Sequence, residues 1–240
     1  MPATFNSLWD PPFPFPSGAR DLPPRGCLAA TPALVASLQR GAPEPLQSSA
    51  SIFMQGGTAI LRGRDYFLAG PILGAPMSVM ALEILMGGGA ENVVFAGFAG
   101  SIAPELKPGD LFVPSRALSS EGTSAHYPAP LVPEAALHDR LALALGGDAG
   151  TASEGCVWST DAPMREIPEV RAAFRDRGAV AVDMVTSALF AAAGFRGKAL
   201  AAALLVTDEF TQDGWREGFG EPDFRRNLAA LSAGAWKAFV

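Results

Sequence analysis

Apolar and polar positions alternate in short blocks along most of the chain. Brief apolar runs between turn residues, typical of buried strands, occur at "GCLAA" (26–30), "YFLAGPIL" (66–73), "NVVFAG" (92–97), "DLFVPSRAL" (110–118), "AVAVDM" (179–184) and "KALAAALLVTDEF" (198–210). Apolar residues at helical spacing, ended by glycine, occur at "SVMALEILMGGG" (78–89), "EVRAAFRDRG" (169–178) and "TSALFAAAGFRG" (186–197). A long closing helix is predicted at "FRRNLAALSAGAWKAFV" (224–240). The order predicts an α/β domain over residues 26–240, with a mostly parallel sheet covered on both faces.

Ligands of such sheets bind at the carboxyl ends of the strands. We therefore expect the site at the turns after Ala96, Pro114, Val182 and Val206.

Residues 1–25 form a different segment, with seven prolines and no periodicity. This composition predicts an extended arm that is either mobile or packed over a neighbouring surface. Its aromatic residues Trp9, Phe13 and Phe15 favour packing.

Composition excludes several classes of function. Charged residues make up 18% of the chain, and the net charge is −6, which argues against nucleic-acid binding. There is neither an apolar run of membrane-spanning length nor a secretory signal pattern, so we expect a cytoplasmic protein without a membrane partner. Cys27 and Cys156 have no disulfide or metal spacing, and we expect neither metal nor cofactor.

Five blocks resemble a known family in order and approximate spacing: "GPILGAPMSVMALEILMGGGAENVVFAGFAGSI", "KPGDLFVPSRALSSEGTSAHY", "VWSTDAPMRE", "VDMVTSALFAAAG" and "LLVTDEF". Over roughly residues 67–210 the chain resembles the nucleoside phosphorylase and nucleosidase superfamily, most closely its uridine and purine phosphorylase branch. The resemblance implies a three-layer α/β fold whose central mixed sheet is distorted toward a barrel and flanked by helices. It also implies a nucleoside or base as ligand, and a homo-oligomer (dimer, trimer or hexamer).

Asp208 ends a long apolar strand, so its carboxyl group is expected to enter the crevice from partly dehydrated surroundings. Such surroundings raise a carboxyl pKa toward neutrality, which suits a general acid. The resemblance implies that Asp208 hydrogen-bonds or protonates the leaving base. The alternative is that Asp208 caps a following helical turn.

Other candidate positions rest on the resemblance. It implies that Met184 packs under the ribose, and that Pro163 and Met164 occupy the loop that normally brings an aromatic ring against the base. Arg165 either reaches a base carbonyl or is simply solvated. The stretch "EGTSAHY" implies sugar and base contacts from Glu121, Thr123 and His126; the alternative is a turn held by its Ser and Thr residues.

"GFAG" (97–100) is interpreted as a glycine turn that lets a ligand approach Gly97 and Phe98. The family's phosphorylases place an arginine at the position of Phe95, a serine or threonine at Phe98, and a further arginine at Leu34. Phenylalanine and leucine cannot replace charged hydrogen bonds to phosphate. The sequence therefore predicts that the family's phosphate site is absent.

The sugar site departs as well. Val185 replaces the glutamate that follows the methionine in the family and holds the ribose hydroxyls. Losing a hydrogen bond to a charged group lowers a rate or binding constant roughly tenfold to over a hundredfold. Asp183 is expected to point to the other face of its strand and cannot simply take that place.

Three hypotheses follow. Retention of Asp208, "EGTSAHY" and "STDA" favours an enzyme that cleaves or exchanges an N-glycosidic bond. Loss of the arginine, serine and glutamate equivalents favours a non-catalytic relative that binds a nucleoside-like ligand or a protein. A dinucleotide-binding oxidoreductase would need G-x-G-x-x-G after the first strand, and the chain offers only "GFAG" in its middle. The base, the sugar and the acceptor stay open.

Overall fold

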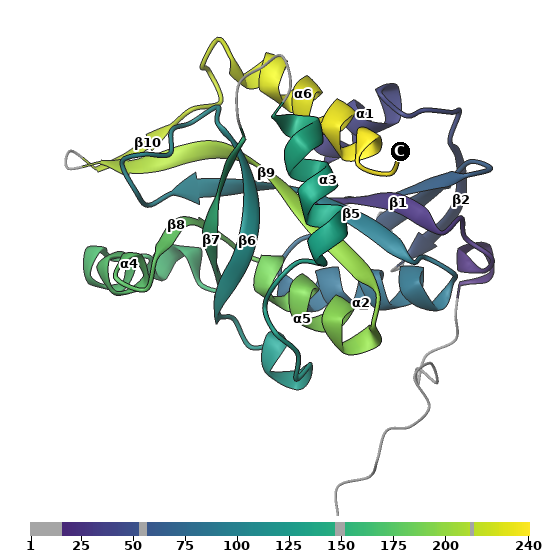
Figure 1. Ribbon diagram of the computed structural model, residues 1–240, viewed down its shortest axis with the longest axis horizontal. Helices are drawn as coiled ribbons and strands as arrows, with labels where there is room; N and C mark the ends of the chain where they lie inside the picture. Colours follow the sequence, from purple (N-terminus) through teal and green to yellow (C-terminus); the bar gives the residue numbers. More distant parts are fainter. Residues whose placement is uncertain (1–15, 53–56, 147–151, 212–213) are drawn as a thin grey trace, which may run out of the picture.

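The computed structural model describes residues 16–52, 57–146, 152–211 and 214–240 (Figure 1). The strands are β1 (Arg25–Ala29), β2 (Gln47–Ile52), β3 (Thr58–Arg62), β4 (Tyr66–Gly70), β5 (Asn92–Ser101), β6 (Leu111–Ser120), β7 (Ser153–Thr160), β8 (Ala179–Asp183), β9 (Ala199–Thr211) and β10 (Gly214–Glu217). The helices are α1 (Pro32–Arg40), α2 (Ala75–Gly87), α3 (Ala135–Leu145), α4 (Pro168–Arg175), α5 (Thr186–Arg196) and α6 (Phe224–Lys237). Three short 3₁₀ helices are η1 (Ser17–Ala19), η2 (Ser124–His126) and η3 (Pro163–Arg165).

The strands form one mixed sheet in the order β10-β9-β6-β7-β8-β5-β1-β4-β3-β2. Because β9 also pairs with β5, the strands β9, β6, β7, β8 and β5 close into a barrel. The fold implied by the family resemblance is therefore confirmed. The expectation of a mostly parallel sheet is wrong, since β2–β3, β3–β4, β5–β8, β6–β9 and β9–β10 are antiparallel. Hairpins at both edges and the closure of the barrel account for these pairs.

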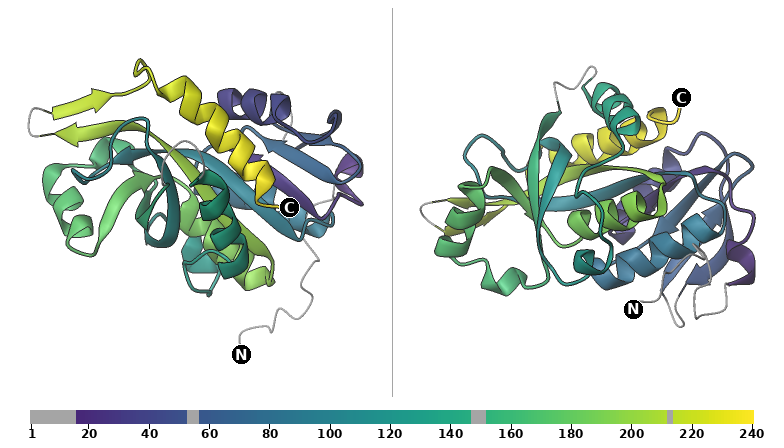
Figure 2. Two further views of the ribbon diagram at one scale, coloured as in Figure 1. Left: turned by 45° about the horizontal axis from the view of Figure 1, so that its top comes forward. Right: turned by 60° about the horizontal axis from the view of Figure 1, so that its bottom comes forward.

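Helices cover both faces of the sheet (Figures 1 and 2). Helices α1, α3 and α6 pack together on one face, α2 and α5 pair on the other, and α4 lies beside β8. The sequence of strand β9 is almost wholly apolar because both of its faces are buried, with alternate residues in two different hydrophobic cores. Leu200, Leu204 and Val206 pack with α2 and α5, whereas Ala201 and Leu205 pack with the opposite helices.

The stretch Gly97–Gly100 is not the predicted turn. Strand β5 continues through it to Ser101, paired with β9 throughout and with β8 at its end. Glycine is needed for close packing instead: a Cβ on Gly97 would lie 2.6 Å from the Cζ atom of Phe95. The glycines therefore mark crowding inside a strand, which sequence alone does not distinguish from a turn.

Two other expected strand ends also lie further along the chain. β6 continues beyond Pro114 to Ser120, with a register shift between Pro114 and Arg116 that accommodates the proline. β9 continues beyond Val206 to Thr211, whereas β8 ends at Asp183, one residue after the position expected.

The described part of the N-terminal segment packs on the domain. Ala19 and Leu22 are buried, and the Leu22 amide donates to the Gly88 carbonyl at 2.7 Å, beyond the end of α2. Trp9, Phe13 and Phe15 lie outside the described residues. Among the described helices, none combines the length and apolarity that crossing a membrane requires.

Candidate functional site

Asp208 lies near the end of β9, half-buried and held on two sides. Its Oδ1 accepts a hydrogen bond from Thr207 Oγ1 at 2.7 Å, and its Oδ2 accepts one from Trp215 Nε1 at 2.9 Å. Gly100 of β5 lies directly beneath, because a Cβ there would come within 2.9 Å of Asp208 Oδ2 and 3.4 Å of Val182 Cγ1. Asp208 is part of a strand rather than a helix cap, and Gly100 connects it to the end of β8.

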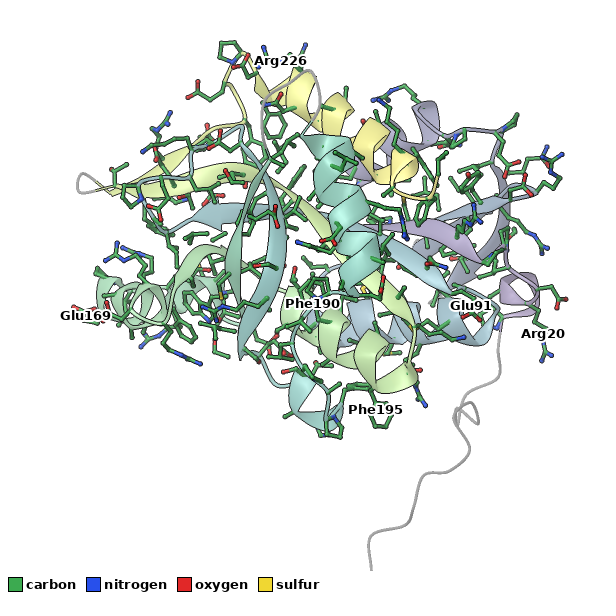
Figure 3. The ribbon with its side chains drawn as sticks, in the orientation of Figure 1. Arg20, Glu91, Glu169, Phe190, Phe195 and Arg226 are labelled. Atoms are coloured by element: carbon green, nitrogen blue, oxygen red, sulfur yellow. The ribbon has the colours of Figure 1, made fainter. Side chains whose placement is uncertain are left out.

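Glu166 is a functional candidate that the sequence did not reveal. It follows η3, and burial together with the nearby charge of Asp208 raises its pKa to about 7, although Arg171 opposes the shift. Arg171 Nη1 donates to the main-chain carbonyl of Glu166. Glu169, one turn into the same segment, is exposed on the outer side of α4 (Figure 3). The two glutamates look alike in the sequence, and only the fold separates them.

The three residues at the positions that the resemblance assigns to phosphate ligands lie in apolar surroundings. Phe95 is 1% exposed within the core against α2 and α5, and Leu34 is buried in α1. Phe98 packs against Phe219 and Phe224, with ring centroids at 6.3 and 6.0 Å. Phe219 and Phe224 also pack on each other at 5.4 Å. We call Phe98, Phe219 and Phe224 the aromatic cluster; it lies over the strand segment that the sequence marked for a ligand.

A buried polar network surrounds the start of α5. Asp183 accepts hydrogen bonds from Ser159 Oγ at 2.6 Å and from the amide and hydroxyl of Thr186 at 3.0 and 2.5 Å. Burial raises the pKa of Asp183, although these hydrogen bonds oppose the shift. Since its oxygens face protein donors, Asp183 serves to fix the β8–α5 turn.

Glu121 joins the same network. Its Oε1 accepts from Ser119 Oγ and Ser187 Oγ, both at 2.9 Å, and its carboxylate also accepts the Thr123 and Ser124 amides. Burial alone would raise its pKa, but these hydrogen bonds together hold the pKa below its ordinary value. The first half of "EGTSAHY" is thus a hydrogen-bonded turn.

Met184 and Val185 form the turn between β8 and α5. Met184 is half-buried against the core, and Val185 is 7% exposed at the position before α5. A carboxylate at 185 would therefore begin the helix next to the Asp183 network. The turn is brought near Asp208 because Gly100 pairs with Val182 on one side and Asp208 on the other.

The remaining predicted residues lie on outer loops. Pro163, Met164 and Arg165 form η3 and are exposed, with Met164 at 92%. They immediately precede Glu166. His126 is exposed on η2, which is anchored by the ring of Tyr127 against Phe195 at 5.7 Å. Burial and the charge of Glu83 raise the pKa of Tyr127 to about 12.

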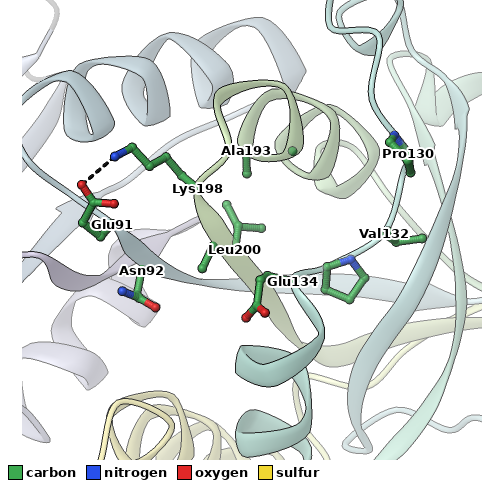
Figure 4. A pocket seen from close by; sticks show the side chains of 12 residues that line it. Glu91, Asn92, Pro130, Val132, Glu134, Ala193, Lys198 and Leu200 are labelled. Carbon is green, nitrogen blue, oxygen red and sulfur yellow. Dashed lines mark hydrogen bonds and ion pairs between the residues drawn. The ribbon is translucent and has the colours of Figure 1, made fainter. Parts of the chain in front are cut away.

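A hollow of about 470 Å³ lies elsewhere, at the amino ends of β5 and β9 (Figure 4). Lys198 and Glu91 on its wall form an ion pair at 2.6 Å, and the Glu134 carboxylate accepts the first amides of α3. Asp208 lies at the other end of β9, so this hollow is not the predicted site. Within the described ranges, no group of three His, Cys, Asp or Glu side chains is arranged to hold a metal ion.

The family model described as "Phosphorylase superfamily" matches residues 24–239. The chain belongs to the phosphorylase superfamily. Two solved structures with the same fold are a purine nucleoside phosphorylase from Toxoplasma gondii in complex with immucillin-H and a P. knowlesi homologue of the P. falciparum enzyme PNP. The first has a TM-score of 0.78 at 19% identity, covering 91% of this chain and 90% of that one. The second has a TM-score of 0.73 at 17% identity, covering 91% and 89%.

Curated relatives of this superfamily member match over shorter spans. A guanosine phosphorylase of Halorubrum lacusprofundi is 28% identical over 148 residues, which is 60% of this chain and 61% of the relative. The uncharacterized protein R802 of Acanthamoeba polyphaga mimivirus is 25% identical over 143 residues, covering 60% and 56%. The match thus spans less than two thirds of either relative.

The candidate site contains two carboxyl groups, Asp208 and Glu166, whose charges interact. Both oxygens of Asp208 accept hydrogen bonds from protein donors, and burial together with the charge of Asp208 raises the pKa of Glu166 to about 7. Two carboxyl groups at different protonation states can donate to one atom of a ligand and accept from another. The rings of the aromatic cluster offer no charge or hydrogen-bond donor to an anion.

Proposed function

We propose that this chain binds a nucleoside at the carboxyl end of β9 and cleaves its N-glycosidic bond, with water as the acceptor. The observation that carries the proposal is the Asp208 carboxylate at the end of β9, held by Thr207 Oγ1 and Trp215 Nε1. Burial and the charge of Asp208 raise the pKa of Glu166 to about 7, which supports the proposal. Superfamily membership supports the reaction class.

The proton requirement of the reaction fits this pair. When the C1′–N bond breaks, the base departs with the electron pair and needs a proton or a strong hydrogen bond. A carboxyl group with a pKa of about 7 is protonated in about half of the molecules at neutral pH, so it can donate and be reloaded. Water adds to C1′, and its released proton returns to the carboxylate or to solvent.

The proposed substrate class is a purine nucleoside whose base carries an N–H on its Watson–Crick edge, such as guanosine or inosine. The Halorubrum relative is named a guanosine phosphorylase and the Toxoplasma structure a purine nucleoside phosphorylase. Carboxylate oxygens only accept hydrogen bonds, so Asp208 complements a ring N–H. A protonated Glu166 complements a ring nitrogen or carbonyl oxygen.

Water is favoured over phosphate by the groups that fill the phosphate positions. Phe95 and Leu34 are buried in the core, and Phe98 is covered by the aromatic cluster. Placing a phosphate dianion against these rings without arginine would be strongly unfavourable. A neutral acceptor avoids that cost.

A second candidate function is non-catalytic binding of a nucleoside-like ligand. Val185 favours it, because the residue is apolar and buried where the family holds the ribose hydroxyls, and Asp183 is engaged by Ser159 and Thr186. Such a protein would bind a base without orienting its sugar for cleavage.

Product analysis separates these functions. Guanosine and inosine are incubated with the protein in phosphate-free buffer and again with 10 mM phosphate, a concentration of the order that saturates typical enzymes. We expect free base and free ribose at equal rates in both buffers. Formation of ribose 1-phosphate, or a rate that rises with phosphate, contradicts water as acceptor. Base binding without release of base in either buffer supports the non-catalytic function.

We also propose that the chain is a homo-oligomer. Leu73 before α2 is 73% exposed and Met80 on α2 is 46% exposed, although α2 is apolar around most of its circumference. Helices of this kind are normally covered. Light scattering should give at least twice the monomer mass of 24.9 kDa, and a monomer mass across micromolar concentrations would refute the assembly.

A further inference from the structure

The β9–β10 hairpin brings Trp215 back over Asp208. In the antiparallel register Trp215 pairs with Phe210 and Glu217 pairs with Asp208. Directly paired residues share a face of the ribbon, so Trp215 and Asp208 are diagonal neighbours on that face. The indole is 58% exposed, yet its N–H donates to Asp208 Oδ2 at 2.9 Å.

Three contacts from different segments define the orientation of the Asp208 carboxylate. Thr207 Oγ1 donates to Oδ1 at 2.7 Å, and Trp215 Nε1 donates to Oδ2. Gly100 packs against Oδ2 so closely that a methyl group on Gly100 would lie only 2.9 Å from it. Hydrogen bonds to an ionised group are stronger than neutral ones. Rotation of the carboxylate would break one of the two hydrogen bonds or collide with the β5 backbone.

The hairpin itself is anchored on both of its faces. On one face, Glu209 accepts hydrogen bonds from Lys107 Nζ at 3.0 Å and Arg216 Nε at 2.9 Å. On the face that carries Trp215, the guanidinium of Arg171 lies 3.8 Å from the ring centroid of Phe210. The place of Trp215 therefore depends on α4 and on the loop before β6, not on the exposed indole alone.

We propose that Trp215 is a positioning residue for Asp208, which aims the remaining acceptor edge of the carboxylate at the ligand. The role rests on the proposed function of Asp208. An indole N–H suits the task because it only donates and carries no charge. A lysine or arginine in its place would neutralise the carboxylate instead of orienting it.

The arrangement also divides the proton chemistry between the two carboxyl groups. Trp215 occupies one oxygen of Asp208 with a donor, so that oxygen is kept as an acceptor. Glu166 lies between η3 and α4, where burial and the charge of Asp208 raise its pKa to about 7 although the charge of Arg171 opposes the shift. In the proposed reaction, Asp208 therefore accepts a hydrogen bond and Glu166 supplies the proton.

The test uses the indole N–H resonances of the ¹⁵N-labelled full chain without substrate. Trp215→Phe identifies the Trp215 resonance by its loss, and Asp208→Asn should move that resonance. Trp158 and Trp236 are internal controls, since their N–H groups donate to Ser120 Oγ at 2.7 Å and to the Leu38 carbonyl at 2.9 Å. A Trp215 resonance that stays in place in Asp208→Asn overturns the proposal.

Kinetics of Trp215→Phe provide the second readout, because the ring is kept and only the donor is lost. We expect kcat for nucleoside cleavage to fall roughly tenfold or more with little change in KM, as for an interaction that matters in the transition state. An unchanged kcat overturns the positioning role. A Trp215 resonance that responds to Asp208→Asn, in a parent protein that cleaves no nucleoside, supports the positioning of Asp208 and contradicts the proposed function instead.

Discussion

The ring of Phe98 meets the ring of Phe219 edge to face, with their centroids 6.3 Å apart and their planes at 74°. This contact joins strand β5 to the loop before α6, at a position where the family resemblance implies a hydroxyl for phosphate. Edge-to-face pairs add stability beyond the apolar area they bury. Phe98 is therefore part of the packing of this loop.

Phosphate should not stabilise the protein. A ligand that prefers the folded state raises the melting temperature in proportion to the logarithm of its concentration above Kd. We expect millimolar phosphate to shift the melting temperature no more than sulfate at matched ionic strength, which controls for general salting effects. A phosphate-specific shift that grows with concentration would show that an anion site exists despite Phe95 and Phe98.

Glu166→Gln should change how stability depends on pH. The raised pKa of Glu166, about 7, means that the folded state favours the protonated form. Its contribution to stability is fully present below the ordinary glutamate pKa and is lost as pH rises through about 7. The parent should therefore lose stability relative to Glu166→Gln between about pH 4.5 and 7.5, measured by urea unfolding.

Glu169→Gln is the matched control for that measurement. Glu169 lies on the exposed side of α4 (Figure 3), so its substitution should leave the pH profile of the parent unchanged. If Glu166→Gln and Glu169→Gln gave the same profile, Glu166 would titrate as an ordinary surface glutamate, and the proposed proton donor would be lost.

Asp183→Ala should destabilise the fold more than a single lost hydrogen bond does. The carboxylate is 7% exposed and receives donors from Ser159 and Thr186, which would be left buried without an acceptor. We expect a loss of roughly 2 to 4 kcal/mol in the free energy of unfolding. Asp161→Ala is the control, because Asp161 is exposed and accepts one amide, that of Gly122. Equal effects of the two substitutions would contradict a supporting role for the network.

Much of the fold could be predicted from the sequence. The apolar runs of β1, β4, β5, β8 and β9 and the periodicity of α2, α5 and α6 were sufficient because burial dominates those segments. The edge strands β2 and β10 were not predicted, because "QSSASI" and "GWRE" are mostly exposed and show no alternation of apolar and polar residues. The prediction of a turn at Gly97 was wrong because the sequence does not distinguish a glycine required by close packing from a glycine required by a turn.

The candidate site was less predictable, since it depends on which side chains meet. Asp208 could be found from its place at the end of a buried strand, but the donors Thr207 and Trp215 could not be assigned to it. Glu166 gives no signal in the sequence, because its raised pKa arises from burial and from a carboxylate 42 residues away in the chain. Glu121 was placed at the sugar site by motif, whereas its carboxylate accepts hydrogen bonds from Ser119 and Ser187 inside the protein.

The most direct measurement is release of free base from guanosine and inosine by the parent, Asp208→Asn and Glu166→Gln, with Asp176→Asn at the exposed end of α4 as control. Positioned proton transfer is worth about 10² to 10⁴ in rate. We predict that the parent releases base and that Glu166→Gln loses about that factor in kcat. Asp208→Asn, which loses a charged hydrogen-bond acceptor, should lose roughly tenfold to a hundredfold. Both variants should remain folded, and Asp176→Asn should retain the parent rate. Base release that persists in both Asp208→Asn and Glu166→Gln at the parent rate would contradict the central claim.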